Sequence, residues 1–350
     1  MQGALFETLI KYDLLDSLLE DYVTNVKYSS EIKIYLDLKA ILKKAYRTNI
    51  NNILKDQKVI IEDITSHIIN MIGFYRNYFY KQGKYSTFYI LYSEKECETL
   101  KSLYPEYKKN YYEKYLNNED EFQNLNNIVK STVKQVKILS KYIPHVYYID
   151  TSDFDEFIYF NYLVRHSGNS FKILFSDDPI MFQALDKDTV ALDVKGENSN
   201  LITNESVIQY LCENNAVELT SNSLNIILSI TGNSEYYNIK GIQSYKYKKA
   251  YKLLEPFFTN VILVNKTYMN IPEVIFTNEL LKENRELIEK NFKVMFPIEI
   301  QMINESKIEE KLIITKPKVS WKEFEKLNQR IFLLFPLNLN MILKGESIDA

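Results

Sequence analysis

The sequence predicts an α/β fold with a mostly parallel central sheet, helices on both faces of that sheet, and a separate helical subdomain. Short runs rich in β-branched and aromatic residues predict strands at residues 31–38, 86–93, 145–150, 170–176 and 189–194. Helix-length segments separate these runs, as expected when parallel strands are joined by crossover helices. From about residue 216, apolar residues recur at helical spacing, which predicts the helical subdomain.

This pattern divides the chain into four parts. We expect an amphipathic helical extension at 1–30, the α/β domain at 31–215, the helical subdomain at 216–300 and a C-terminal extension at 301–350. Apolar residues at helical spacing in 59–79 and 154–166 predict two right-handed crossover helices. Near the C-terminus, residues 298–303 predict a strand and residues 321–335 a helix.

Composition limits the classes of protein to consider. The 350 residues are 46% hydrophobic, which is enough for a substantial core, and the net charge of -3 gives no global attraction to nucleic acid. Cys97 and Cys212 show no metal-type spacing and fit a reducing compartment. No segment approaches the ~20 apolar residues of a membrane span. We expect a cytoplasmic protein without a membrane partner. Many tyrosines beside few glycines fit a protein encoded by a low-GC genome, phages among them, and a phage protein would lie in the host cytoplasm.

Acidic side chains follow three of the predicted strands, and the carboxyl ends of parallel strands meet at one edge of a sheet. Carboxylates gathered there raise one another's pKa, and a bound divalent cation relieves their repulsion. The sequence therefore predicts an acidic centre at this edge. Its candidate residues are Asp37 after the first strand, Asp153, Asp155 and Glu156 after the third, and Asp177 and Asp178 after the fourth.

Helix capping is the alternative explanation for each of these acids. Asp37 precedes a helical stretch, and capping is favoured for this residue taken alone. Residues 151–157 resemble a capping box and fit either explanation equally well. In residues 175–185 a cap accounts for one aspartate and leaves the second unexplained.

Four segments carry a resemblance to a known family. Residues 89–115 contain the order Pro105, Glu106, Tyr107, Lys108 and Asn110, and residues 153–166 begin with acids that open a helix. Residues 176–185 keep Ser176, Asp178 and Gln183, and residues 230–254 contain Gly-Ile before a basic helix. In this order they resemble the strand, arch, acidic motifs and helix-three-turn-helix clamp of the 5′ nucleases. The chain is similar to this flap endonuclease-like, PIN-like superfamily, of which bacteriophage 5′-3′ exonucleases are members.

The resemblance implies a metal-dependent hydrolase. In the family, carboxylates hold two Mg²⁺ or Mn²⁺ ions that clamp the scissile phosphate and activate water. Magnesium prefers oxygen ligands, which matches a centre without histidine or cysteine. The aligned positions make Asp37, Asp153, Asp155 and Asp178 the expected catalytic metal ligands, with Glu156 as a further ligand.

The acidic set is nevertheless incomplete. Ser93 stands where the family has an aspartate after the second strand, and Ile180 replaces the second aspartate of the fourth-strand motif. The expected Gly-Asp turn reads Gly232, Asn233, Ser234, with Glu235 as its only acid. Because these replacements remove negative charge, we expect one ion or none and impaired or lost hydrolysis.

Basic residues are better preserved. The predicted clamp contains Lys240, Gly241, Lys246, Lys248, Lys249 and Lys252, and a glycine there lets backbone amides approach phosphate. In the predicted arch, Lys108, Lys109 and Lys114 alternate with tyrosines and could follow a single strand, although a solvated lysine face above packed tyrosines explains them equally well.

Two functions follow from these observations. The first is a divergent 5′ nuclease-like protein that binds branched, flap or single-stranded DNA, with hydrolysis impaired or lost. If hydrolysis survives, we expect a Mg²⁺- or Mn²⁺-dependent 5′-3′ exonuclease or flap endonuclease. The second is an inactive nuclease-fold subunit of a phage replication, transcription or packaging assembly, with other phage proteins as its partners.

Overall fold

The structure is a computed structural model that describes residues 31–49, 56–95, 97–107, 119–192, 201–203, 221–234, 237–258 and 270–314, and the single residues 207, 322 and 326. The predicted helical extension at 1–30 lies outside these residues, as does nearly all of the predicted helix at 321–335.

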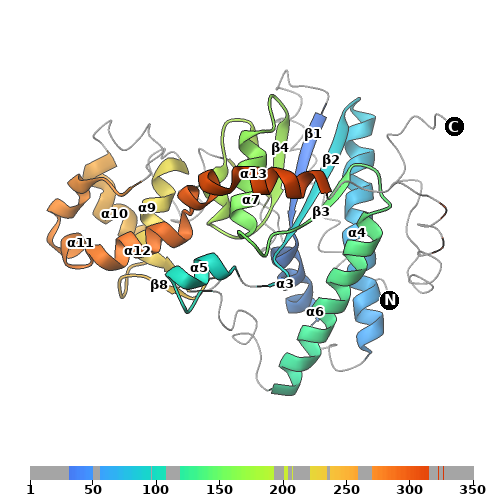
Figure 1. The fold of residues 1–350 in the computed structure, drawn as a ribbon, viewed down its shortest axis with the longest axis horizontal. Coiled ribbons are helices and arrows are strands. Elements are labelled where there is room, and N and C mark those ends of the chain that lie inside the picture. The colour runs from blue at the N-terminus through green and yellow to red at the C-terminus, as the bar shows by residue number, and fades with distance from the viewer. Residues whose placement is uncertain are drawn as a thin grey trace.

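A mostly parallel sheet forms the centre of the molecule (Figure 1). Its strands lie in the order β3-β2-β1-β4-β5-β6, and only the β5–β6 pair is antiparallel. The five predicted strands are confirmed, and the short β6 was not predicted. The strands are β1 (Glu31–Asp37), β2 (Tyr85–Tyr92), β3 (Val146–Asp150), β4 (Phe171–Phe175), β5 (Thr189–Leu192) and β6 (Leu201–Ile202).

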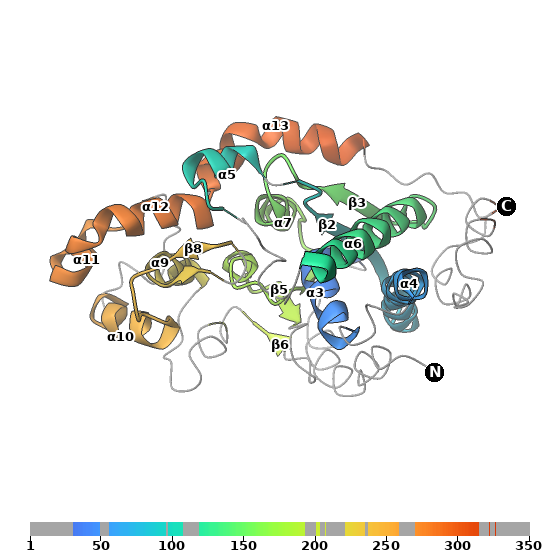
Figure 2. The ribbon, with the colours of Figure 1, turned by 90° about the horizontal axis from the view of Figure 1, so that it is seen from below.

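Helices cover both faces of the sheet, as the sequence predicted (Figure 2). The helices α3 (Leu38–Asn49), α4 (Gln57–Lys81) and α6 (Glu119–Ser140) lie on one face, and α7 (Glu156–Arg165) and η3 (Met181–Ala184) lie on the other. Strand β1 shows why two layers form. Ile34 and Leu36 point into the apolar cluster on the α3, α4 and α6 face, and Tyr35 points into the cluster on the α7 face. None of the described helices is both long and apolar enough to cross a membrane.

Helices and a small hairpin make up the end of the molecule on the left of Figure 1. Helix α9 packs against α10, α12 and η3, so this helical part shares one apolar cluster with the α7 face of the sheet. Its elements are α9 (Ser221–Thr231), β7 (Gly232–Asn233), β8 (Ile239–Lys240), α10 (Tyr247–Phe258), η4 (Glu273–Thr277), α11 (Glu279–Glu283) and α12 (Arg285–Met295).

Two further helices connect the halves of the molecule. Helix α5 (Glu98–Leu103) follows β2 and contacts α12, and α13 (Ile298–Ile314) packs against α7. The predicted strand at 298–303 is wrong, because these residues are the first part of α13. Gln301 and Ile308 are buried seven residues apart on one helical face, and the Asn161 side-chain amide donates to Gln301 Oε1 at 2.6 Å.

Candidate functional site

The carboxyl ends of four strands meet at one edge of the sheet. Strands β2 and β4 both pair with β1, and β3 pairs with β2, all in parallel. The segments that follow these strands therefore lie side by side, as the sequence predicted. They contribute Asp37 at the end of β1, Ser93 after β2, residues 151–156 after β3 and residues 176–178 after β4.

Asp37 caps a helix and also contacts the segment after β4. Its Oδ1 accepts the backbone N–H of Ala40 at 3.1 Å, which caps α3. Its Oδ2 accepts the hydroxyl of Ser176 at 2.7 Å and so links β1 to the segment after β4. Burial, followed by the nearby charge of Glu156, raises the pKa of Asp37 to about 6. The carboxyl group thus lies in a buried and negatively charged environment.

Asp155 and Glu156 open α7 beneath β2. Asp155 caps the helix by accepting the N–H of Phe157 at 3.2 Å, and its φ of 91° is a strained backbone conformation for a residue with a side chain. The other carboxylate oxygen of Asp155 accepts the hydroxyl of Tyr107. Glu156 Oε1 accepts the backbone N–H of Ser93 at 2.9 Å. Both acids are buried and are held by donors of the protein itself.

The acids after β4 are held in the same way. Asp178 Oδ1 accepts the N–H of Ile180 at 2.9 Å, and its Oδ2 accepts the hydroxyl of Tyr237 at 2.6 Å. Asp177 forms an ion pair with Lys43 of α3 at 3.8 Å, and both side chains are buried. A lysine ammonium group therefore lies within the acidic centre.

Tyr107 and Tyr237 form a pair in this centre. Their ring centroids are 5.4 Å apart with an interplanar angle of 39°, and the residues are only 1% and 3% exposed. Burial, and next the charge of Asp155 or Asp178, raises the pKa of each phenol well above its usual value. Both hydroxyls consequently remain protonated and donate to the carboxylates.

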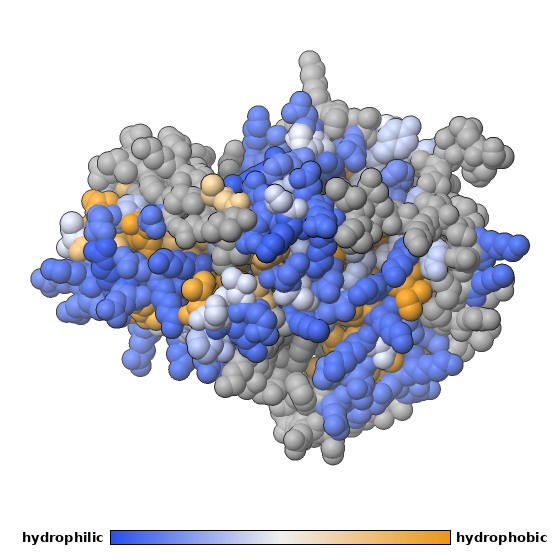
Figure 3. Space-filling view, viewed as in Figure 1, coloured by the Kyte–Doolittle hydropathy of each residue, from blue (hydrophilic) through white to orange (hydrophobic). Residues whose placement is uncertain are grey.

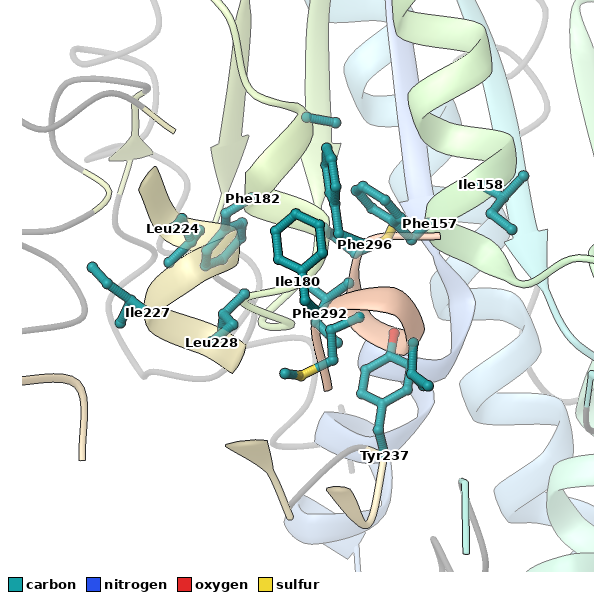
Figure 4. Close-up of a cluster of buried hydrophobic side chains, with 14 of the residues drawn as sticks. Phe157, Ile158, Ile180, Phe182, Leu224, Ile227, Leu228, Tyr237, Phe292 and Phe296 are labelled. Atoms are coloured by element: carbon teal, nitrogen blue, oxygen red, sulfur yellow. The ribbon is translucent and has the colours of Figure 1, made fainter. Parts of the chain in front are cut away.

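The residues that replace family acids have structural partners. The hydroxyls of Ser93 and Thr151 are hydrogen-bonded at 2.8 Å, while Glu94 binds Lys137 and Tyr148 and points away from the centre. Ile180 is buried among aromatic and aliphatic side chains between the sheet and the helical part (Figure 4). Ser234 is exposed, and Glu235 lies outside the described residues.

Asp153 does not join the other acids. Its carboxylate accepts the Tyr159 hydroxyl at 3.0 and 3.1 Å and forms an ion pair with Lys311 of α13 at 2.9 Å. The side chain is 40% exposed. The structure thus brings together Asp37, Asp155, Glu156 and Asp178 with Asp177 and leaves Asp153 at the surface.

The residues present do not fit a two-metal centre in this conformation. Among the described residues, no three side chains of His, Cys, Asp or Glu converge in a way that could hold a metal ion. Tyrosine hydroxyls and backbone amides already use oxygens of Asp155, Glu156 and Asp178 that ligands would need. A magnesium site requires free carboxylate oxygens and room for several waters.

The basic residues of the predicted clamp lie on the hairpin and on α10. Lys240, Lys246, Lys248, Lys249 and Lys252 are exposed, and no carboxylate of the described chain forms an ion pair with them. Figure 3 shows mainly hydrophilic side chains over the neighbouring α11 and α12. The predicted arch lysines Lys108, Lys109 and Lys114 lie outside the described residues.

Glycine lets the hairpin close tightly beside these lysines. A Cβ atom at Gly241 would lie 2.1 Å from the carbonyl carbon of Thr231, and Gly232 has a φ of +65°. Asn291 of α12 donates to the carbonyl groups of Ser229 and Lys240 at 3.0 and 2.8 Å, which anchors the hairpin. The backbone before α10 is thereby fixed in place.

Comparison with known proteins identifies the fold. No protein-family model and no curated protein matches the sequence. A solved structure of the bacteriophage T5 flap endonuclease, a pseudo-enzyme complex with product DNA and metal ions, aligns with a TM-score of 0.55 at 15% identity, over 89% of this chain and 99% of that one. The chain has the 5′ nuclease fold. Bacteriophage T5 5′-exonuclease with bound zinc aligns over the same shares with a TM-score of 0.54 at 14% identity.

Within this 5′ nuclease fold, three side chains that contact the acids were not among the predicted site residues, namely Tyr107, Tyr237 and Lys43. Tyr107 belongs to the predicted arch motif, but a contact with an acid was not expected of it. The only available signal for Tyr237 was its position in the turn where the resemblance led us to expect an acid. No local pattern marks Lys43 as a partner of Asp177, because 134 residues separate them.

Proposed function

We propose that this protein binds DNA through a basic surface formed by the β7–β8 hairpin and α10, and that its acidic centre no longer hydrolyses phosphodiesters. The observation that carries the proposal is the pair of hydrogen bonds from Tyr107 and Tyr237 to Asp155 and Asp178. These hydroxyls bind carboxylate oxygens that two metal ions would need as ligands.

The basic surface supports the binding half of the proposal. Its lysines project from a hairpin held by Gly232, Gly241 and Asn291 and from the first turns of α10. Exposed ammonium groups that pair with no carboxylate among the described residues are available to phosphates, and such contacts position a protein on DNA without reading its sequence. The T5 flap endonuclease, which shares the fold, was solved with DNA.

The acidic centre supports the second half. A tyrosine hydroxyl is a neutral donor, so it satisfies a carboxylate lone pair without offsetting its charge as a dication would. Ile180 binds Asp178 through its backbone N–H, and its side chain lies in the apolar cluster, so this position supplies no oxygen ligand for a magnesium ion. Lys43 supplies positive charge to Asp177 from within the protein.

Fluorescence anisotropy with a labelled duplex tests the binding. We expect Lys248→Glu to weaken binding by about tenfold and to reduce the salt dependence by about one phosphate contact. Lys81→Glu makes the same charge change at the exposed last residue of α4 and serves as the matched control. Equal weakening by both variants would show that attraction is diffuse and would contradict the proposed surface.

A cleavage assay tests the centre. We expect no cleavage of a labelled 5′-flap DNA by the wild type with Mg²⁺ or Mn²⁺. The Asp178→Ala variant identifies contamination, because any cleavage that persists in it comes from another protein. Cleavage by the wild type that Asp178→Ala abolishes would reject the loss of hydrolysis. Ser93→Asp combined with Ile180→Asp tests whether restored acids return activity, with circular dichroism to verify folding.

The assembly-subunit function remains the alternative. It predicts a folded protein that neither binds nor cleaves DNA in these two assays. That result would favour a role in binding other proteins.

A further inference from the structure

A segment that we call the strap, residues 97–107, is bound at both ends to the residues that follow β3 at the acidic centre. It follows β2 and contains α5. At one end, the Cys97 thiol donates to the backbone carbonyl of Asp153 at 3.3 Å. At the other end, Tyr107 donates its hydroxyl to Asp155 at the start of α7. Cys97, Leu100 and Tyr107 are each no more than 1% exposed, so the strap is packed along its length.

The same strap is bound to the helical part. The Tyr104 hydroxyl accepts the N–H of Lys240 at 3.2 Å, and the ammonium group of Lys290 lies 4.7 Å from the Tyr104 ring centroid. Asn238 donates its side-chain amide to the carbonyl of Glu106 at 3.2 Å. The Tyr107 ring contacts Tyr237 directly. The strap therefore bridges β7–β8 and α12 to α7.

The strap leaves the acidic centre buried and the basic surface exposed. Asp155 and Asp178 are 2% and 5% exposed under the strap and hairpin, so a phosphate cannot touch them in this arrangement. Lys246, Lys248 and Lys249 are exposed on the outside. DNA can thus meet the basic surface while the acidic centre stays closed.

We propose that Tyr107 and Tyr237 are specificity-determining residues that keep the strap closed, so that the protein binds double-helical DNA on its basic surface and admits no single-stranded end to the acidic centre. This inference rests on the proposed DNA-binding function and names the class of DNA that the surface takes.

The chemistry of the ligand explains the exclusion. A single-stranded end that displaced the tyrosine hydroxyls would bring phosphate oxygens, which are anionic acceptors, toward buried carboxylates. It would remove two hydrogen-bond donors and supply only repulsion in their place. A duplex that lies on α10 leaves these hydrogen bonds intact, and its affinity does not depend on a free 5′ end.

Binding and thiol accessibility together test the inference. Anisotropy compares a blunt duplex with the same duplex carrying a 5′ single-stranded flap. In parallel, alkylation of Cys97 reports opening of the strap, because this thiol is buried in it. Peptide mass spectrometry reads Cys97 apart from Cys212. The test variant combines Tyr107→Phe with Tyr237→Phe, and Tyr35→Phe is the matched control because it removes one buried hydroxyl contact, to Ser167, outside the strap.

We expect the wild type to bind the two DNAs with affinities within about twofold of each other. In the double variant, Cys97 should be alkylated about tenfold faster, and the flap DNA should bind more tightly than the blunt duplex. Tyr35→Phe should change neither quantity. A wild type that prefers the flap by about tenfold overturns the inference while leaving DNA binding intact, as does a folded double variant with unchanged alkylation. A folded wild type that binds neither DNA overturns the proposed function itself. If the double variant does not fold, Tyr107→Phe alone decides by the same two measurements.

Discussion

Tyr237 donates its hydroxyl to Asp178 from a turn in which the family resemblance led us to expect an acidic ligand. Tyr107 makes the equivalent bond to Asp155. Hydrogen bonds to charged groups contribute about 1.5 to 3 kcal/mol each, and a buried carboxylate left without its donor is costly. The hydroxyls of Tyr107 and Tyr237 therefore stabilise the two buried carboxylates.

His67 provides a residue-scale prediction about pH. Burial, followed by the charge of Lys44, lowers the pKa of this α4 histidine to about 4. The unfolded chain therefore binds more protons than the folded chain between about pH 6.5 and pH 4. The free energy of unfolding should fall as pH decreases through this window, by on the order of 3 kcal/mol. Above it, this contribution is fully present.

Urea unfolding at a series of pH values measures this effect. His67→Gln removes the titrating group, so the variant should show a shallower loss of stability between pH 6.5 and pH 4. An identical pH dependence in the variant and the wild type would assign the acid sensitivity to other groups.

At the scale of elements, the β7–β8 hairpin depends on two glycines for its close approach to the end of α9. Gly241→Ala should destabilise the fold by at least about 2 kcal/mol, because its Cβ would lie 2.1 Å from the Thr231 carbonyl carbon. Gly168→Ala is the matched control, since Gly168 has a φ of +61° and no atom within 4 Å of an added Cβ. That change should cost about 1 kcal/mol. Equal losses in urea unfolding would show that the approach of Gly241 to Thr231 adds no cost of its own and would contradict this prediction.

A ladder of tyrosines spans three strands of the sheet. Tyr35, Tyr89 and Tyr147 occupy paired positions on β1, β2 and β3, and successive ring centroids lie 5.2 Å apart at interplanar angles of 14° and 17°. Cross-strand aromatic pairs stabilise a sheet beyond the area that they bury. The central ring takes part in two such pairs and the edge ring in one.

Replacement of ladder residues should reveal this difference. Tyr89→Leu removes both stacks and should lower the free energy of unfolding by about 1 to 3 kcal/mol, whereas Tyr147→Leu removes one and should cost about half as much. Urea unfolding of the two variants measures the ratio. A larger loss for Tyr147→Leu would mean that edge-strand burial, not stacking, controls the stability of the ladder.

At the scale of the whole molecule, the α7 face of the sheet and the helical part share one core. Gln183 after β4 donates to the carbonyl of Met295 in α12 at 3.1 Å, and Asn161 of α7 bonds to Gln301 of α13. Ile180 and Phe292 lie in the same apolar cluster (Figure 4). The acidic centre lies beside this shared core, so the packing of the two parts helps to position it.

The response to metal is therefore a whole-molecule prediction. An ion held with a Kd one hundredfold below its concentration would stabilise the fold by about 2.7 kcal/mol. We expect the melting temperature to be the same in excess Mn²⁺ and in EDTA, because the carboxylates already have donors. A clear upward shift with Mn²⁺, absent in Asp178→Ala, would show that the centre binds an ion despite its tyrosines.

The strand runs and their parallel direction could be predicted from the sequence, because strand periodicity and crossover spacing are local properties of the chain. The 5′ nuclease fold was expected from the order of four motifs that resemble that family. The sequence also showed which predicted strand ends carry acids. Its failure at 298–303 has the same origin, since alternation over six residues also fits one turn of an amphipathic helix, and burial against α7 selected the helix.

The partners of each acid depend on tertiary packing and could not be read from the sequence. Asp153 and Asp155 are two residues apart, yet one binds Lys311 at the surface and the other lies under Tyr107. Tyr237 and Asp178 are 59 residues apart, and Lys43 and Asp177 are more distant still. Hydrogen bonds and ion pairs act over a few ångströms in space, so the partners of each carboxylate depend on how the sheet, the strap and the hairpin pack together.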